Sequence, residues 1–334
     1  MHIRDVRTTI RTILLILPLL LLQELRAQQL PIYSQYVMNG FMINPAYAGH
    51  DGYTSFNATA RQQWLGFKNA PQTYSASWQT RLFRRSYKIK PNPFTKKNML
   101  IPSTKGRVGL GAYVINDRNA NVARTGLSFT YAYHIILKDK QLSFGLALKA
   151  FQYRIFTEHL TFGESGDPVI NSDQLRGVAY SPDADFGVLL HGPTYFTGFS
   201  VSNLLESAVM VGGNEIPDFK TYRHYWVIGG YEFQVSREVE IEPSVLLKTT
   251  ENWNPQGDIS VRVYYDDLFW GGVSYRTNQS LILLLGVRFE SIYFGYAFDW
   301  ALSEIGHFNY GSHEITLSVK LGDNARRYRW LNRY

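Results

Sequence analysis

Residues 257–265 read Gly-Asp-Ile-Ser-Val-Arg-Val-Tyr-Tyr, and this stretch decides the fold class. Apolar residues occupy every second position, at Ile259, Val261 and Val263, and polar residues such as Arg262 lie between them. A period of two is that of a β-strand, whose successive side chains point to opposite faces. The stretch therefore predicts a strand with one apolar and one polar face.

The same alternation recurs from about residue 53 to the C-terminal region, for example in residues 123–137, 238–248 and 313–321. Long helical stripes of period 3.6 are missing. About fourteen strands are predicted in all, near residues 53–65, 72–83, 106–116, 123–137, 140–155, 183–192, 194–203, 222–235, 238–249, 256–265, 267–277, 280–290, 291–300 and 312–322.

The composition favours a membrane protein built from strands over one built from helices. Hydrophobic residues make up 45% of the chain, yet the mean hydropathy is only −0.20, as alternation would give. After the first 27 residues no segment reaches about 18 consecutive apolar residues, the length that a membrane-spanning helix needs. The 23 Tyr and 20 Phe suit the aromatic belts at the two edges of a bilayer.

A soluble β-sandwich alternates in the same way, so the two architectures must be separated. The polar faces carry long side chains of both charge signs, such as Arg262 and Glu242, as expected of a wet or salt-bridged lumen. Several strands exceed about ten residues, the length of a tilted membrane crossing. We therefore expect an all-β, closed transmembrane antiparallel β-barrel, with both termini on the periplasmic side because the strand number is even.

The first residues direct export. Arg4, Arg7 and Arg11 precede the apolar run Ile13–Leu22, and a small residue, Ala27, precedes a polar start. This order predicts a secretory signal peptide at residues 1–27, cleaved after Ala27. The alternative is an uncleaved anchor, for which the run is too short to cross a bilayer.

The absence of cysteine and the distribution of charge limit the cellular compartments and the classes of partner to be expected. The chain contains no cysteine, which suits an oxidising compartment and excludes disulfides and thiolate metal sites. The formal charge of +7 includes an excess of Arg at the two ends of the chain, and elsewhere Lys and Arg mix with acids. Charge alone thus gives no reason to expect a nucleic-acid partner.

The barrel, residues 53–322, has a segment on each side. The leader, residues 28–52, holds several tyrosines with Pro45 and Gly49, and we expect it inside the barrel or across its periplasmic mouth; the alternative is that it merely caps the first strand. The tail, residues 323–334, is basic and aromatic. We expect one of two roles for the tail. It docks on an acidic partner or on membrane phosphates, or it is a frayed terminus whose Arg residues contact lipid headgroups.

The lumen is predicted to be narrow or plugged. The inward-facing set mixes cations with anions, namely Lys149, Arg262, Arg288 and Lys320 with Glu232, Glu240, Glu242 and Glu314. Ion pairs across the barrel would fill such a lumen, whereas an open pore is lined mainly by one sign or by small residues. Pro243 predicts a bulge or a local edge in its strand. The long connections, at 84–105, 156–182 and 204–221, are expected to face outward.

No catalytic constellation is found. The chain lacks a Gly-x-Ser-x-Gly elbow and a His-Glu-x-x-His motif, and His313 and Glu314 are adjacent strand residues that point to opposite faces. Asp266-Asp267 is more simply a turn than a metal site. Arg61 and Trp64, three apart on a predicted strand, would point to opposite faces, and we assign them a structural role. We expect no enzymatic activity, no cofactor and no metal.

Two motifs near the start of the mature chain carry a family resemblance. Residues 33–39 read Tyr-Ser-Gln-Tyr-Val-Met-Asn, residues 44–49 read Asn-Pro-Ala-Tyr-Ala-Gly, and Arg-Gln-Gln-Trp follows at 61–64. They resemble the start of the PorP/SprF family, outer-membrane proteins associated with type IX secretion and gliding motility in Bacteroidota. Weaker matches, such as Gly109-Leu-Gly111, Leu142-Ser-Phe-Gly145 and Gly295-Tyr296, extend the resemblance over nearly the whole mature chain. The tail after Gly322 departs from the family pattern.

The resemblance implies a function that alternation alone does not. It implies an accessory barrel of the bacterial outer membrane that binds a periplasmic ring component or lipoprotein of the secretion machinery, a large secreted adhesin, or both, and so supports export or surface anchoring. The alternative is a transport barrel for a small or hydrophobic solute. Partner-binding residues are expected at Tyr36, Asn44, Pro45, Tyr47, Arg61, Trp64, Arg326, Arg327, Tyr328 and Trp330.

Overall fold

The computed structural model describes residues 33–82, 85–91, 98–104, 107–137, 140–156, 178–206, 208–211, 214–277 and 279–322. The predicted signal peptide, the first residues of the leader and the tail at 323–334 lie outside this part of the chain. No helix among the described residues is long and apolar enough to cross a membrane.

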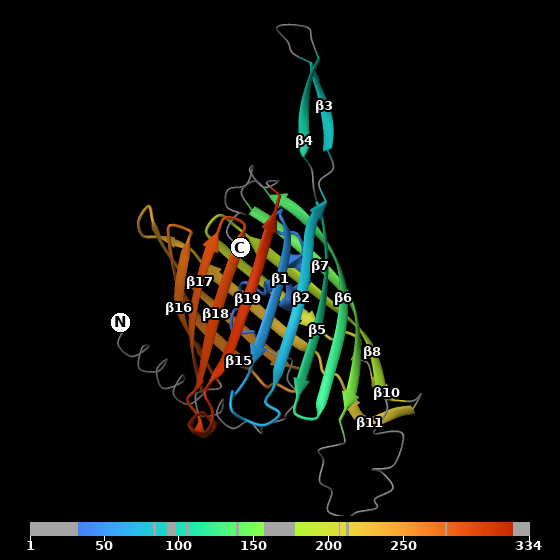
Figure 1. Cartoon of the computed structure of the whole chain (residues 1–334). Helices are drawn as coiled ribbons and strands as arrows, with labels where there is room; N and C mark the ends of the chain where they lie inside the picture. Colours follow the sequence, from blue (N-terminus) through green and yellow to red (C-terminus); the bar gives the residue numbers. More distant parts are fainter. Residues whose placement is uncertain are drawn as a thin grey trace, which may run out of the picture.

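Fourteen antiparallel strands form one closed barrel (Figure 1). These wall strands are β1 (Thr54–Gln62), β2 (Gln72–Leu82), β5 (Val108–Asn119), β6 (Val122–Leu137), β7 (Lys140–Ile155), β8 (Val178–His191), β9 (Tyr195–Ser202), β12 (His224–Tyr231), β14 (Val239–Thr250), β15 (Gln256–Tyr265), β16 (Phe269–Arg276), β17 (Ser280–Phe289), β18 (Ile292–Ala301) and β19 (Ser312–Leu321). The barrel closes because β1 pairs with both β2 and β19. The prediction of an antiparallel barrel of about fourteen strands is confirmed.

Alternation sets the two faces of the wall as the sequence predicts. Along β15, Ile259 is 60% exposed and Val263 is 42% exposed on the outer face, whereas Arg262 is 5% exposed on the inner face. The same inward set of charges includes Lys149, Glu242 and Glu314, all buried. Apolar side chains therefore face lipid and polar side chains face the lumen, as a strand that crosses a bilayer requires.

Shorter strands lie in two of the long connections. β3 (Arg85–Pro91) pairs with β4 (Asn98–Thr104), and β10 (Ala208–Val211) pairs with β11 (Asn214–Lys220). The two-residue strand β13 (Phe233–Gln234) continues the ladder of β12 along β14.

The two ends of the barrel are distinguished by the end of β19. At the end where β19 finishes, called the terminal end, Leu321 pairs with Thr54, and β2 and β5 meet there through the pair Leu82 and Val108. The connection from 83 to 107 therefore leaves from the terminal end, whereas 157–177 and 203–223 connect strands at the opposite end. The expectation that all three long connections face outward is therefore wrong, because the first lies at one end of the barrel and the other two lie at the opposite end.

Two local predictions are resolved by the structure. β1 ends at Gln62, so Trp64 lies in the following loop, with φ at +50°, and not on the strand. Pro243 causes no register shift, because β14 pairs with β15 residue for residue. On its other side, pairing stops at Gly230 and resumes at Phe233, so Pro243 faces a gap in the ladder, which is the local edge predicted as the alternative to a bulge.

The described part of the leader, residues 33–52, lies inside the barrel (Figure 1). It folds into a single helical turn, α2 (Gly40–Ile43), and a 3-10 turn, η2 (Pro45–Tyr47). Phe41, Ala46, Tyr47 and Ala48 pack with lumen-facing residues of the wall into one buried apolar cluster. The leader therefore occupies space in the lumen that would otherwise hold water.

Candidate functional site

The beginning of the described leader is held by a buried ion-pair network. Arg61 on β1 places Nη2 2.6 Å from Asp299 Oδ2 on β18 and Nη1 3.0 Å from Glu314 Oε2 on β19. Both carboxylates also bind the leader: Ser34 Oγ donates to Asp299 at 2.7 Å and Ser34 N donates to Glu314 at 2.8 Å. Gln35 N donates to the other oxygen of Glu314 at 2.9 Å. Arg61 thus balances two carboxylates that hold the backbone of the leader, and Arg276 Nη1 on β16 lies 3.5 Å from the same Asp299 oxygen.

The middle of the leader reaches the far wall. The Tyr36 hydroxyl lies 2.8 Å from Ser244 Oγ on β14 and donates to Ser260 Oγ on β15 at 3.0 Å. Asn44 Nδ2 donates to the backbone carbonyls of Val188 on β8 and Phe199 on β9, at 3.0 and 3.3 Å. Both side chains therefore tie the leader to strands on the opposite side of the ring from Arg61.

Asn44 has a second task within the leader. Its Oδ1 accepts a hydrogen bond from Ala46 N at 2.9 Å, which caps the start of η2. Pro45 occupies the first position of that turn, where its fixed φ is favourable and its missing N–H costs nothing. The Asn-Pro-Ala-Tyr motif therefore forms a capped turn, and its asparagine also donates hydrogen bonds to the wall.

The end of the leader is held through its carbonyl oxygens. His134 on β6 lies 3.0 Å from the Ala48 carbonyl, and Gln141 on β7 donates to the His50 carbonyl at 3.0 Å. Arg81 on β2 donates to the same His50 carbonyl at 3.4 Å and to Gln141 Oε1 at 2.8 Å. Backbone groups that a loop would normally expose to water are thus satisfied by the wall.

Glycines on the inner wall make room for the leader. A Cβ added to Gly145 on β7 would lie 2.2 Å from the carbonyl carbon of Pro45, and one added to Gly109 on β5 would lie 1.9 Å from the carbonyl oxygen of Ala48. At Gly187 on β8 it would lie 2.0 Å from Asn44 Oδ1. Any larger residue at these positions would displace the leader. The wall is therefore shaped to this particular segment.

The remaining lumen charges pair between neighbouring strands. Arg262 bonds to Glu242, its direct partner in the β14–β15 register, and Arg276 lies 2.7 Å from Asp258 across β15 and β16. Lys149 on β7 lies 2.6 Å from Asp185 on β8. The expected ion pairs across the barrel are therefore replaced by pairs along the wall, because the leader fills the space between opposite walls.

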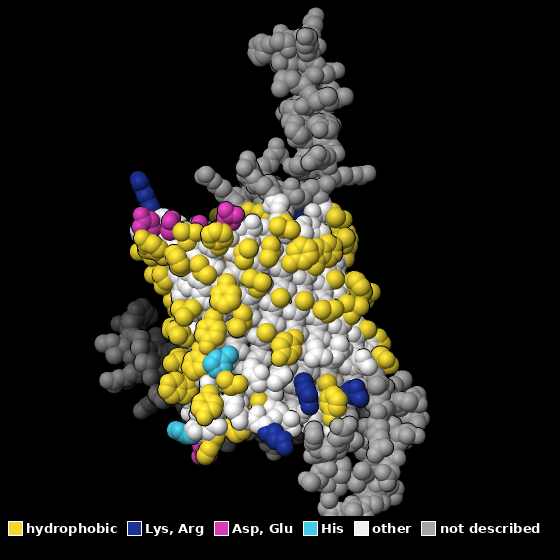
Figure 2. Space-filling model, viewed as in Figure 1, with side chains coloured by type: hydrophobic (Ala, Val, Ile, Leu, Met, Phe, Trp, Pro, Cys, Tyr) yellow, Lys and Arg dark blue, Asp and Glu magenta, His cyan; other side chains and the backbone are white. Residues whose placement is uncertain are grey.

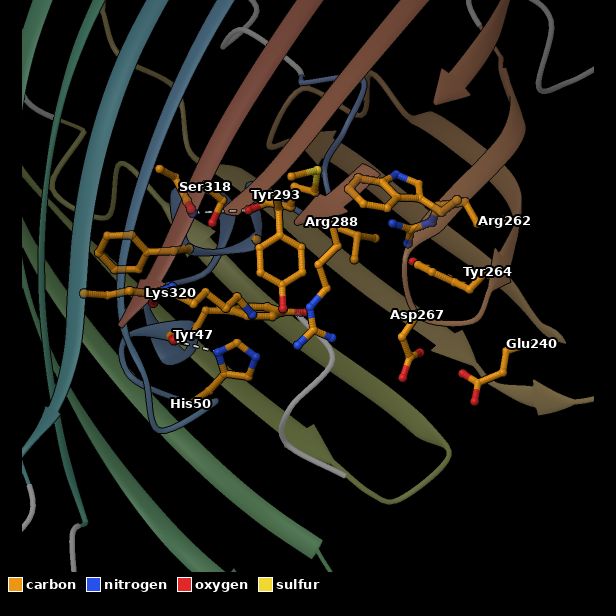
Figure 3. Close-up of a pocket in the computed structure, with 17 residues that line it drawn as sticks. Tyr47, His50, Glu240, Arg262, Tyr264, Asp267, Arg288, Tyr293, Ser318 and Lys320 are labelled. Carbon is orange, nitrogen blue, oxygen red and sulfur yellow. Dashed lines mark hydrogen bonds between the residues drawn. The ribbon is translucent and has the colours of Figure 1, made fainter. Parts of the chain in front are cut away.

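A cavity remains between the leader and the strands β14 to β19, near the terminal end (Figure 3). The space between its atoms, including the opening to solvent, is about 870 Å³. Tyr47 and His50 of the leader form one side, and Arg262, Tyr264 and Arg288 are among the wall residues.

Cations gather around one tyrosine in this cavity. Arg288 and Lys320 lie 5.3 and 5.2 Å from the centre of the Tyr293 ring, and Lys320 also pairs with Asp51 at 3.1 Å. His50 lies outside the wall strands, and burial lowers the pKa of its imidazole below the ordinary value although the Asp51 carboxylate raises it. The cavity can therefore receive a polar group from the terminal end while its leader side stays neutral.

The sequence-derived site residues fall into three groups. Tyr36, Asn44, Pro45, Tyr47 and Arg61 come together in the lumen, where the wall and the leader are their partners. Trp64 lies at the opposite end, half-buried, and its backbone N–H donates to Ser312 Oγ at 3.1 Å. The tail residues Arg326, Arg327, Tyr328 and Trp330 lie outside the described part of the chain. Binding of another protein by any of these residues stays a prediction.

Several residues of this site were not singled out from the sequence. Ser34 and Asp299 complete the Arg61 network, and Gly187 accommodates Asn44. The sequence signal for a segment packed against the wall was that several glycines occupy inward-facing positions of the alternating strands. Within the described residues, no group of three or more His, Asp or Glu is placed to hold a metal ion.

Comparison with solved structures finds outer-membrane barrels. The toluene transporter TbuX of Ralstonia pickettii aligns with 85% of this chain and 93% of its own, at 11% identity and a TM-score of 0.48. The CymD monoaromatic hydrocarbon channel aligns with 84% of this chain and 91% of its own, at 11% identity and a TM-score of 0.47. The translocator domain of the autotransporter NalP from Neisseria meningitidis gives 9% identity, 81% and 88% coverage and a TM-score of 0.38. A comparison with curated protein sequences finds no match.

The family comparison covers most of the chain. The model described as type IX secretion system membrane protein PorP/SprF matches residues 25–319, which include the leader, the Arg61 network and almost all of the wall. Both the match and the closed wall place the protein in the bacterial outer membrane. The chain belongs to the PorP/SprF family of type IX secretion system membrane proteins.

Proposed function

We propose that this barrel is an accessory of the type IX secretion and gliding machinery that works by binding other proteins at its two mouths. It binds a periplasmic ring component or lipoprotein of the machinery, a large secreted adhesin, or both, and thereby supports cargo export or surface anchoring. The observation that carries the proposal is the leader in the lumen. A barrel whose interior holds its own chain, bonded to strands on opposite sides of the ring, is better suited to anchoring partners than to passing solutes.

The terminal end offers the groups for a periplasmic partner. The cavity beside Tyr293 opens there, and the basic tail leaves the wall there after Leu321. Arg326, Arg327 and Arg329 with Trp330 supply charge and aromatic surface of the kind enriched at protein interfaces. These features support a partner with an acidic surface.

Deletion of the gene followed by surface proteomics tests the proposal. We expect at least one secreted surface protein to be lost and to return with the wild-type chain, and a secretion component to co-purify with the barrel from native outer membrane. A chain truncated after Gly322 should still fold and reach the membrane, but should retain less of that component. Unchanged surface proteins together with no co-purifying secretion component would contradict the proposal. A steady open conductance through the purified barrel would favour the alternative, transport of a small or hydrophobic solute.

A further inference from the structure

Two guanidinium groups on the outer wall share one aromatic ring. Arg118 near the end of β5 lies 4.9 Å from the centre of the Phe156 ring, and Arg154 on β7 lies 5.1 Å from the same centre. Ala123 on β6 pairs with both arginines in the register, so a small side chain separates them. Phe156 is itself positioned by a backbone hydrogen bond from its N–H to the Asn121 carbonyl at 2.7 Å.

The described residues around this pair are neutral. Alternation places Gln72, Asn116, Thr125 and Gln152 on the same outer face of the adjoining strands. Asn116 donates to Thr125 Oγ1 at 2.8 Å. Among the residues that the structure describes, neither arginine forms an ion pair with a carboxylate. Two like charges are thus held near each other with hydrogen-bonding groups around them and no anion in the described part.

The two arginines lie at the border of the apolar outer face, at the end of the barrel opposite the terminal end. Figure 2 shows basic side chains along the lower edge of this face, below a broad hydrophobic region. The same strands expose Tyr74, Val114 and Leu148 by 50%, 50% and 64%, as a lipid-facing surface does. The terminal end is the expected periplasmic side because the first wall strand begins there and the last one ends there, so the opposite end, with the connections 157–177 and 203–223, is extracellular. The arginines therefore lie at the level of the outer-leaflet headgroups.

We propose that Arg118 and Arg154 bind the phosphate of an outer-leaflet glycolipid of the lipid A type, with its acyl chains along the apolar face formed by β5 to β7. Guanidinium groups match phosphate in bidentate geometry, and a phosphate relieves the repulsion between two neighbouring cations. The neutral amides and hydroxyls nearby suit the sugar of the same headgroup. The site is independent of the cavity at the terminal end and goes beyond the proposed binding of proteins.

Native mass spectrometry of the purified full-length barrel tests this site with diphosphoryl lipid A and with the same lipid freed of phosphate. We expect the wild type to retain the phosphorylated lipid at least tenfold more strongly than the dephosphorylated one. The double variant Arg118→Gln/Arg154→Gln should lose that preference by about tenfold or more, because each charge-assisted contact contributes roughly a factor of ten. Arg118→Lys/Arg154→Lys should retain part of it.

Two controls keep the result interpretable. Lys68→Gln removes an exposed cation from the β1–β2 loop at the same end and should leave lipid retention unchanged. An unchanged thermal unfolding midpoint in dephosphorylated lipid shows that the double variant is folded. The proposal is overturned if the double variant retains phosphorylated lipid as the wild type does. It is also overturned if inorganic phosphate alone competes fully with the lipid, since the ligand would then be free phosphate, or if both lipids are retained equally.

Discussion

Replacing Arg61 with methionine removes the cation at the centre of the leader anchor. The side chain is 6% exposed and forms bonds of 2.6 and 3.0 Å to Asp299 and Glu314. The variant leaves the buried Glu314 without its cation and leaves Asp299 with the more distant Arg276, whose Nη1 lies 3.5 Å away. We expect these carboxylates to loosen their grip on Ser34 and Gln35, because water must enter to solvate them.

The size of the effect follows from the contacts. Each hydrogen bond to a charged group contributes about 1.5–3 kcal/mol, and breaking a buried ion pair from one side costs about 3–5 kcal/mol. We therefore expect the free energy of leader release to fall by about 4 kcal/mol, which is close to a thousandfold rise in the released population. The surface pair Arg223–Glu206 is the matched control: Arg223 is 40% exposed, so Arg223→Met should cost at most about 1 kcal/mol.

Hydrogen exchange of the reconstituted barrel measures the change directly. Backbone amides of residues 34–51 should lose roughly 10²–10³-fold protection in Arg61→Met and keep it in Arg223→Met. Adding Asp299→Asn and Glu314→Gln to Arg61→Met should restore part of the protection, because neutral amides need no balancing charge. Equal protection in Arg61→Met and wild type would refute the assignment of Arg61 as the anchor. Further loss in the triple variant would show that the uncompensated charge is not the cause.

Three other predictions concern the same geometry. Gly145→Ala should weaken leader protection by about 1–3 kcal/mol because its Cβ would meet Pro45 at 2.2 Å, whereas Gly229→Ala, whose nearest atom lies at 3.7 Å, should be tolerated; equal effects of the two would contradict the close fit. Asn44→Ala should cost about 1–3 kcal/mol in thermal stability, since the carbonyls of two wall strands lose their side-chain donor, and an unchanged midpoint would exclude that role. Because the chain has no native cysteine, an impermeant maleimide should label Lys68→Cys but not Asp266→Cys on intact cells, and the reverse pattern would invert the orientation of the barrel.

The wall could be predicted closely from the sequence, because the alternation of apolar and polar residues follows from lipid on one face of each strand and the lumen on the other. β7 and β15 have the predicted bounds, 140–155 and 256–265, and the apolar faces turn outward as expected. Turns between such strands are short, so few register choices remain. Less accurate was the expectation for the connection 83–107, although the two strands predicted before it already return the chain to the end at which it starts.

The lumen could be predicted only in part. The mixed charges of Arg262 and Glu242 indicate a filled interior, but their pairing along the wall depends on a register that only the folded ring sets. Ser34 and Asp299, which form a hydrogen bond, are 265 positions apart in the chain, and no local sequence pattern predicts such a contact. Gly145 reads in the sequence as a weak family match; its role becomes visible only when Pro45 lies against it.

Electrical recording from the purified barrel in a planar bilayer tests the central claim, that the leader occupies the lumen and leaves the mouths as the working surfaces. The wild type should show no steady open conductance at moderate voltage. Arg61→Met should show intermittent openings, and a chain lacking residues 33–52 should show a steady one if it inserts. A steady open conductance of the wild type, unchanged by loss of the leader, would contradict the account.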